Sequence, residues 1–340
     1  MTAVDMTPLI AIFGAGSIGV FVGGALIAGG ANVVLIGRAR VGERIARHGL
    51  AVSDMDGRRF QLPAEQVQYS EDPAALAGAR LVLVTVKSAD TEAAAHSLAA
   101  HAAADAIVIS LQNGIGNADV LRRALPGRQV LAGMVPFNVV QTGDGRFHRG
   151  TEGSLTVEAS PALAPWLPAF EAAGLSLLQR ADFAAVQWGK LLLNLNNAVN
   201  ALSGLPLKTQ LSQRDYRRCL ALLMDEALRA LRAAGIEPAQ VARVAPARLS
   251  RLLRLPDWLY KRLGSASLRI DPEARSSMWE DLQAGRRTEI DYLNGAVVTL
   301  AQSVGLDAPA NRRIVDLVHA AEKGKPQAMA GDGLLMALQK

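Results

Sequence analysis

The chain contains few cysteines and histidines, the residues on which disulfide-bonded proteins and many metal sites depend. Its 340 residues include one cysteine, Cys219, and five histidines. A single cysteine excludes an internal disulfide framework and fits a reducing compartment, so we expect a cytoplasmic protein. The apolar neighbours Leu220, Leu222 and Leu223 predict that Cys219 is a buried helix residue rather than a nucleophile. The histidines do not have the spacing of metal ligands, which predicts no metal site.

Aromatic residues are also scarce, at 4% of the chain, although the net charge is +5. The basic residues concentrate between positions 243 and 269, where Asp257 is the one acidic residue. Proteins that bind single-stranded nucleic acid combine such charge with stacking aromatic side chains. We therefore expect no nucleic-acid partner and interpret the charge as a solvated surface that also attracts anionic ligands.

Charged residues are absent from Met6 to Gly37. A transmembrane helix is a formal alternative for this stretch, because about 20 apolar residues span a bilayer. Eight glycines and Asn32 interrupt the stretch, however, and a buried strand, a helix and a second strand account for it. The first residues lack the positive charge of a signal peptide. We expect no membrane partner.

A glycine turn follows the apolar run Leu9–Phe13 and reads Gly14, Ala15, Gly16, Ser17, Ile18 and Gly19. Gly14 permits a tight turn, Gly16 lets the backbone approach a pyrophosphate, and Gly19 lets the next helix pack on the sheet. The helix N-terminus then offers free amides and a positive dipole end to an anion. We predict that these six residues bind a dinucleotide.

The second strand-like run, Asn32–Ile36, is followed closely by Arg38. Enzymes that use NAD carry an acidic residue at this strand end, whereas an arginine suits a ribose 2′-phosphate. Arg38 therefore favours NADP(H), with Arg40 as a second candidate contact. The alternative is a surface arginine with no ligand.

Two further buried strand-like runs end at Lys87 and at Asn113. Ligands of open α/β sheets bind outside the carboxyl ends of the strands. We therefore expect Lys87 and Asn113 to lie in the same cleft as Gly14 and Arg38.

The pattern then changes twice along the chain. Residues 138–159 alternate in the manner of antiparallel strands at a sheet edge. Beyond residue 182 the pattern predicts helices over 183–202, 215–234, 238–255, 275–284, 289–304 and 311–323. The sequence thus predicts an α/β N-terminal Rossmann-type dinucleotide-binding domain, residues 1–181, followed by an all-α C-terminal substrate and catalytic domain, residues 182–340.

The predicted helix 183–202 carries one lysine and four asparagines among apolar residues. Lys190, Asn194 and Asn197 lie at i, i+4 and i+7 and therefore share one face. Polar side chains on a buried helix need partners, which a ligand or neighbouring helices can supply. The sequence leaves both sources open.

A second polar cluster comprises Ser276, Ser277 and the run from Arg287 to Gly295. Thr288 is a predicted N-cap for a helix beginning at Glu289, and a purely structural role for this cluster is one interpretation. The other is functional. Glu289 close to Lys190 would keep the lysine charged and aimed, as a proton donor to a carbonyl requires.

Together these motifs resemble the ketopantoate reductase (2-dehydropantoate 2-reductase) family over essentially the full length of the chain. The matching residues are Gly14, Gly16, Gly19, Arg38, Lys87, Asn113, Gly114, Gly116, Lys190, Asn194, Ser276, Ser277, Met278, Thr288, Glu289, Ile290, Asp291, Tyr292, Asn294 and Gly295. The resemblance implies reduction of 2-dehydropantoate to (R)-pantoate with NADP(H), a step toward pantothenate and coenzyme A. Lys87 and Arg38 would hold the cofactor.

The resemblance also implies roles at the reacting centre. Lys190 would be the general acid that protonates the ketone oxygen as hydride arrives, and Glu289 would hold Lys190 and the nascent hydroxyl. Asn113 would lie beside the nicotinamide and the substrate. Ser277 would bind the substrate carboxylate, and Asn194 would contact its hydroxyl end.

Two departures from the family pattern concern the substrate. The family usually places its next asparagine eight residues after the lysine, where this chain has Ala198, so the second substrate amide is either Asn197 or Asn200. The stretch 237–271 is also longer than in compact members. The alternatives are a reductase for another branched or aromatic 2-ketoacid, of the D-mandelate type, and a non-catalytic NADP-binding regulator. A homodimer is expected by family analogy alone.

Overall fold

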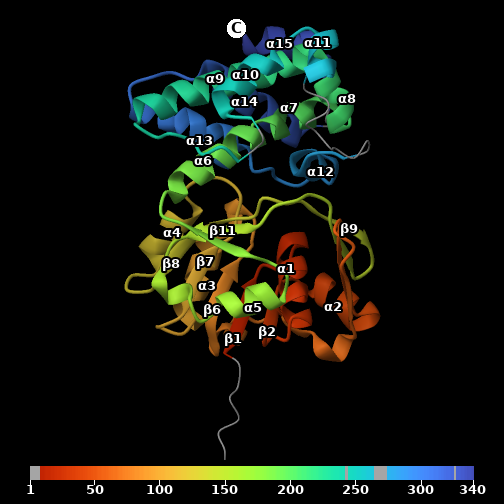
Figure 1. Cartoon of the computed structure of the whole chain (residues 1–340), viewed down its shortest axis with the longest axis vertical. Helices are drawn as coiled ribbons and strands as arrows, with labels where there is room; N and C mark the ends of the chain where they lie inside the picture. Colours follow the sequence, from red (N-terminus) through yellow and green to blue (C-terminus); the bar gives the residue numbers. More distant parts are fainter. Residues whose placement is uncertain (1–7, 242–243, 264–273, 325–326) are drawn as a thin grey trace, which may run out of the picture. The chain divides into compact units, whose positions relative to one another are not determined.

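The computed structural model describes residues 8–241, 244–263, 274–324 and 327–340. The chain divides into two compact units, Met1–Phe183 and Ala184–Lys340. The first is an α/β unit built on a mostly parallel sheet, and the second is helical throughout its described part (Figure 1). The predicted fold class is confirmed.

The first unit contains an eight-stranded sheet. Its strands are β1 (Leu9–Phe13), β2 (Val33–Ile36), β5 (Gln68–Ser70), β6 (Ala79–Val84), β7 (Ile107–Ser110), β8 (Val130–Met134), β11 (Leu155–Glu158) and β12 (Leu177–Arg180). Their order is β12-β11-β8-β7-β6-β1-β2-β5, and the six strands from β8 to β5 are parallel. The strand order reverses at β1, between β2 and β6, and such a reversal is where open α/β sheets bind ligands.

Helices connect the parallel strands. They are α1 (Ser17–Ala28), α2 (Ala39–His48), α3 (Thr91–His101), α4 (Asn117–Ala124) and α5 (Leu167–Ala172). The helix α1 is buried along most of its length because it contacts β1 and β2 and also a second sheet, of order β4-β3-β10-β9. The strands of that sheet are β3 (Leu50–Asp54), β4 (Arg59–Leu62), β9 (Val139–Gly143) and β10 (Arg146–Arg149).

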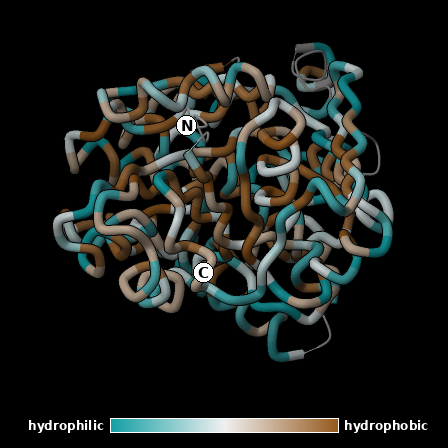
Figure 2. Tube along the Cα trace, turned by 90° about the horizontal axis from the view of Figure 1, so that it is seen from below, coloured by the Kyte–Doolittle hydropathy of each residue, from teal (hydrophilic) through white to brown (hydrophobic). Residues whose placement is uncertain are grey.

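The stretch up to Gly37 contains no charged residue because its strands are buried and α1 is covered by the strands of both sheets. The described part of that stretch is a strand, a 12-residue helix and a second strand, as predicted. No helix in the described ranges is long and apolar enough to cross a membrane. Figure 2 shows hydrophobic stretches alternating with hydrophilic ones along the trace.

The prediction for residues 138–159 was partly wrong. Only β11 joins the large sheet, where it lies between β12 and β8 and runs antiparallel to β8. The antiparallel pair β9 and β10 joins the second sheet instead, where β10 runs parallel to β3. The physical reason is burial, because Phe147 of β10 enters the same hydrophobic cluster as Phe21 of α1.

The second unit is arranged around the long helix α9 (Arg214–Ala233), which packs against α7, α8, α10, α13, α14 and α15 and also contacts α11 through Arg217. The helices of this unit are α6 (Phe183–Asn194), α7 (Asn196–Ser203), α8 (Leu207–Ser212), α10 (Pro246–Leu253), α11 (Asp257–Leu263), α12 (Ser277–Gln283), α13 (Ile290–Ser303), α14 (Pro309–Lys323) and α15 (Gly331–Leu338). Cys219 on α9 is fully buried, as predicted, and burial raises the pKa of its thiol to about 12.

Two helix predictions required correction. The helix expected over 183–202 is divided at Leu195 into α6 and α7. The helix expected over 238–255 begins only at Pro246, because Ala239 donates a backbone hydrogen bond to Ala185 and lies along α6 instead. Of the long stretch 237–271, residues 242–243 and 264–271 lie outside the described residues.

Candidate functional site

The glycine turn after β1 has two kinds of glycine. Gly14 has φ +112°, and a Cβ there would lie 2.5 Å from the backbone nitrogen of Val86. A Cβ at Gly19 would collide with the carbonyl oxygen of Gly14. A Cβ at Gly16, in contrast, would meet no atom within 4 Å. Packing within the protein requires glycine at positions 14 and 19. Gly16 instead keeps open the space before α1, through which a ligand could approach the backbone.

The turn is tied to the strands on both sides of β1. The backbone nitrogens of Gly14 and Ala15 donate to the carbonyl of Ile36 at the end of β2. On the other side, the Thr85 hydroxyl, just after β6, donates to the carbonyl of Gly14 at 2.7 Å. Thr85 was not among the predicted site residues, because a threonine at a strand end gives no signal in a single sequence. Ser17 and Ile18 form the half-buried first turn of α1.

Arg38 combines a fixed backbone with an exposed side chain. Its carbonyl accepts a hydrogen bond from the Tyr69 hydroxyl at 2.8 Å, and burial together with the charge of Glu71 raises the pKa of Tyr69 to about 12. The Arg38 side chain is 86% exposed, with Nη2 3.8 Å from a carboxylate oxygen of Asp90. Arg40 is also exposed. Because the backbone of Arg38 is held and its guanidinium is exposed, the guanidinium is available to an anion at the end of β2.

The loops after β6 and β7 are joined by buried polar groups. Ser88 donates through Oγ to the carbonyl of Asn113 at 2.9 Å, and Asn117 donates through Nδ2 to the same carbonyl at 2.7 Å. Lys87 is exposed beside Ser88, and Asn113 is half-buried. The structure thus places Gly14, Arg38, Lys87 and Asn113 at the carboxyl ends of four neighbouring strands, β1, β2, β6 and β7.

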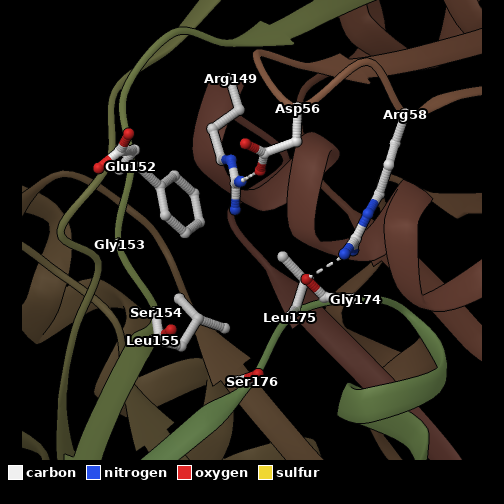
Figure 3. A pocket seen from close by; sticks show the side chains of 11 residues that line it. Asp56, Arg58, Arg149, Glu152, Gly153, Ser154, Leu155, Gly174, Leu175 and Ser176 are labelled. Atoms are coloured by element: carbon white, nitrogen blue, oxygen red, sulfur yellow. Dashed lines mark hydrogen bonds and ion pairs between the residues drawn. The ribbon is translucent and has the colours of Figure 1, made fainter.

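A pocket of about 250 Å³ lies elsewhere in the first unit, and no predicted site residue lines it (Figure 3). Arg149 extends from β10 to Asp56 at 2.7 Å, and Arg58 donates to the carbonyl of Gly174 at 3.1 Å. These contacts fasten the turn between β3 and β4 to β10 and to the segment before β12.

Lys190 lies on α6, next to Gly189. A Cβ at Gly189 would collide with the carbonyl oxygen of Ala239, so the extended segment there packs directly on α6. Burial lowers the pKa of Lys190 to about 8, and the negative charge of Glu289 acts in the opposite direction. A lysine with such a pKa can give up and regain a proton near neutral pH, which suits a general acid or base.

The asparagines of α6 and α7 fall into two groups. Asn194 and Asn197 are half-buried, and their side-chain amides have no hydrogen-bond partner among the described residues. Asn200 is fully buried; its Nδ2 donates to the Leu205 carbonyl, and its Oδ1 accepts from the Ser276 backbone, each at 2.9 Å. The protein itself uses the Asn200 amide. Of the two alternatives for the second substrate amide, this geometry favours Asn197.

The two serines before α12 have separate positions. Ser276 is the N-cap, because its Oγ accepts from the backbone nitrogen of Trp279 at 3.2 Å, and it is buried. Ser277 begins the helix and is exposed. The hydroxyl of Ser277 is therefore the one accessible to a ligand.

The segment that carries Glu289 caps α13. The Thr288 hydroxyl accepts from the backbone nitrogen of Ile290 at 3.3 Å. The predicted N-cap was nevertheless wrong by one residue, because α13 begins at Ile290 and its N-cap position is Glu289 rather than Thr288. Glu289 is 9% exposed. Over the residues that the structure describes, no group of three or more His, Cys, Asp or Glu side chains could hold a metal ion.

Comparison with known families decides what this arrangement belongs to. The model described as Ketopantoate reductase PanE/ApbA matches residues 10–162, and the model of the C-terminal region of the same family matches residues 182–322. The chain belongs to the ketopantoate reductase family. The resemblance seen in the sequence is confirmed, and membership makes the chain an oxidoreductase.

Relatives extend over nearly the whole chain. A 2-dehydropantoate 2-reductase of Halobacterium salinarum is 31% identical and covers 92% of this chain and 99% of its own length. A PanE/ApbA family ketopantoate reductase structure from Ralstonia eutropha has a TM-score of 0.79 at 32% identity, covering 93% of this chain and 98% of its own. A structure of D-mandelate dehydrogenase with NADH and anilino(oxo)acetate, with a TM-score of 0.75 at 21% identity, covers the same shares and shows the fold alone.

Proposed function

We propose that this ketopantoate reductase family member reduces 2-dehydropantoate to (R)-pantoate with NADPH. The observation that carries the proposal is the pKa of Lys190. Burial lowers it to about 8, and the charge of Glu289 acts against this lowering. The name of the Halobacterium salinarum relative supports the substrate. In this proposal residues 1–181 hold the cofactor, and residues 182–340 supply the catalytic lysine.

The first unit fits a nicotinamide dinucleotide. The open space at Gly16 and the free amides of α1 suit a pyrophosphate, since a Cβ there would occupy only that space. Lys87 and Asn113 lie at the neighbouring strand ends. The exposed guanidinium of Arg38 supports a 2′-phosphate and hence NADP(H). When bound, the reduced cofactor supplies a hydride for the carbonyl carbon.

The protein must then supply a proton to the carbonyl oxygen. In our proposal the Lys190 ammonium gives up one N–H proton, an O–H bond forms on the former ketone oxygen, and the neutral amine regains a proton from solvent. The charge of Glu289 favours the ammonium form before the reaction. Asn113, Asn194 and Asn197 would orient the substrate. The exposed Ser277 hydroxyl would bind its carboxylate.

The identity of the ketoacid has a second candidate. Position 198, eight residues after Lys190, is a fully buried alanine. The side-chain amide of Asn200 is already hydrogen-bonded within the protein. Fewer amides for a terminal hydroxyl would suit a branched or aromatic 2-ketoacid without one. Phenylglyoxylate and 2-ketoisovalerate, tested beside 2-dehydropantoate with NADPH, separate the candidates.

The same panel separates the enzyme from a non-catalytic regulator. A regulator needs neither Lys190 nor Glu289, so their presence supports the enzyme. NADPH binding without turnover of any ketoacid in the panel would favour the regulator.

A further inference from the structure

The segment that carries Glu289 is held by helix α14 on both sides of that residue. The backbone nitrogen of Thr288, before it, donates to Oε1 of Glu322 at 2.7 Å. The carboxylate of Asp291, after it, lies 2.9 Å from Nε2 of His319. Because Glu289 stands between these two attachments, the position of its carboxylate depends on both.

His319 connects the two attachments to each other. Its Nδ1 lies 2.9 Å from Oε2 of Glu322, while its Nε2 faces Asp291. A neutral imidazole can donate only one hydrogen bond, whereas an imidazolium can donate both. Two carboxylates on one ring therefore favour the charged ring, and without it their like charges would face each other.

The titration of these groups agrees with the geometry. The hydrogen bond to Glu322, helped by Asp291, raises the pKa of His319 above 6.5, although burial opposes this. Burial also opposes the shift at Glu322, but hydrogen bonds from His319 and Thr288 lower the pKa of that carboxyl. Within the described ranges, the charged groups that act on His319 are Asp291 of α13 and Glu322 of its own helix.

We propose that charged His319 is a positioning residue of the reaction, which clamps the segment from Thr288 to Asp291 so that Glu289 acts on Lys190. This inference rests on the proposed function, because it assumes that Lys190 transfers the proton. The clamp makes His319 a second ionisable group on which the pH dependence of the reaction rests, because the clamp weakens as pH rises through the pKa of His319.

The two pH effects can be separated by direction of reaction. In ketoacid reduction, loss of a proton from Lys190 and loss of one from His319 both lower the rate as pH rises. In oxidation of the hydroxyacid, Lys190 must be neutral to accept a proton, so its contribution rises with pH. The contribution of His319 still falls. A descending limb in the oxidation direction is therefore the expected sign of the clamp.

The test compares His319→Ala with His319→Lys, which keeps a positive charge to about pH 10. We expect His319→Ala to lower kcat about tenfold, the effect of losing roughly one positioning interaction, with KM for NADPH unchanged. His319→Lys should recover most of kcat and remove the descending limb of oxidation. Arg312→Ala is the matched control, since Arg312 is on the same helix and pairs with Asp307. It should leave kcat unchanged.

A direct readout does not depend on turnover. The pKa of Lys190, followed by NMR of the isotopically methylated amine, should fall in His319→Ala because Glu289 is no longer held, and should return in His319→Lys. An unchanged Lys190 pKa in His319→Ala would overturn the clamp, as would wild-type kcat in that variant. Absence of ketoacid turnover in the wild type would instead overturn the proposed function and leave the pKa comparison to decide the clamp.

Discussion

The side chain of Asn200 accepts a hydrogen bond from the backbone nitrogen of Ser276 at 2.9 Å, inside the helical unit. The Ser276 hydroxyl returns a hydrogen bond to the carbonyl of Asn197 at 3.1 Å. These bonds join α7 to the start of α12, and the next residue is the exposed Ser277. A buried asparagine thus positions a serine that is proposed to bind the substrate carboxylate.

This relationship predicts different effects at two asparagines. Asn200→Ala should lower the free energy of unfolding by about 1–3 kcal/mol, because it leaves buried backbone groups without partners. Asn197→Ala should leave stability nearly unchanged and raise KM for the ketoacid. Urea denaturation and steady-state kinetics on both variants check this. A raised KM in Asn200→Ala, with lost stability in Asn197→Ala, would instead assign the substrate contact to Asn200.

The glycine turn offers a matched pair of substitutions. Gly16→Ala places a methyl group in open space, so stability should hold while the Kd for NADPH rises. Gly19→Ala would collide with the carbonyl oxygen of Gly14 and should lower the melting temperature. Thermal denaturation and cofactor titration separate the two effects. Unaltered NADPH affinity in Gly16→Ala would contradict a pyrophosphate at this turn.

Arg38 is expected to decide between the two nicotinamide cofactors. Arg38→Ala should raise KM for NADPH about tenfold to a hundredfold, as loss of a hydrogen-bonded charge pair does, and KM for NADH far less. Arg47→Ala is the control, because Arg47 is exposed at the other end of α2. Equal changes for both cofactors in Arg38→Ala would exclude contact with a 2′-phosphate.

The pKa of Lys190 sets the pH dependence of the proposed reaction. The pKa is lowered from 10.5 to about 8, so ketoacid reduction should be insensitive to Lys190 below that pH and fall above it as the ammonium form is lost. Glu289→Gln removes the opposing charge, so the apparent pKa should fall further. A plot of kcat against pH for wild type and Glu289→Gln measures both. An unchanged midpoint would show that Glu289 does not act on Lys190.

The sequence was sufficient for the parts of the fold that follow from local pattern. The strands before Gly14, Lys87 and Asn113 are continuous apolar runs, and their alternation with helices predicts a parallel sheet. Strand order was not readable, because β9 and β10 join a second sheet through burial of Phe147 against α1, a contact between distant segments. Residues 239–241 likewise lie along α6 instead of forming a helix.

The candidate site was predictable at residues whose chemistry is unusual for their position, such as Arg38 at a strand end and Lys190 in an apolar helix. The residues that support them were not. Thr85 and Tyr69 act through hydrogen bonds from their hydroxyls to the backbone of the glycine turn and of Arg38. His319 contacts the carboxylate of Asp291 only because α13 and α14 pack together, whereas its other partner, Glu322, lies on the same helix.

The most direct test of the account measures NADPH oxidation with 2-dehydropantoate by wild type and Lys190→Ala, together with NADPH affinity from cofactor fluorescence. The account predicts that the wild type prefers 2-dehydropantoate to 2-ketoisovalerate and phenylglyoxylate. It also predicts that Lys190→Ala binds NADPH as tightly while kcat falls by about 10²- to 10⁴-fold, the range for loss of a general acid. Wild-type turnover in Lys190→Ala would contradict the assignment of the proton donor on which the proposed function depends.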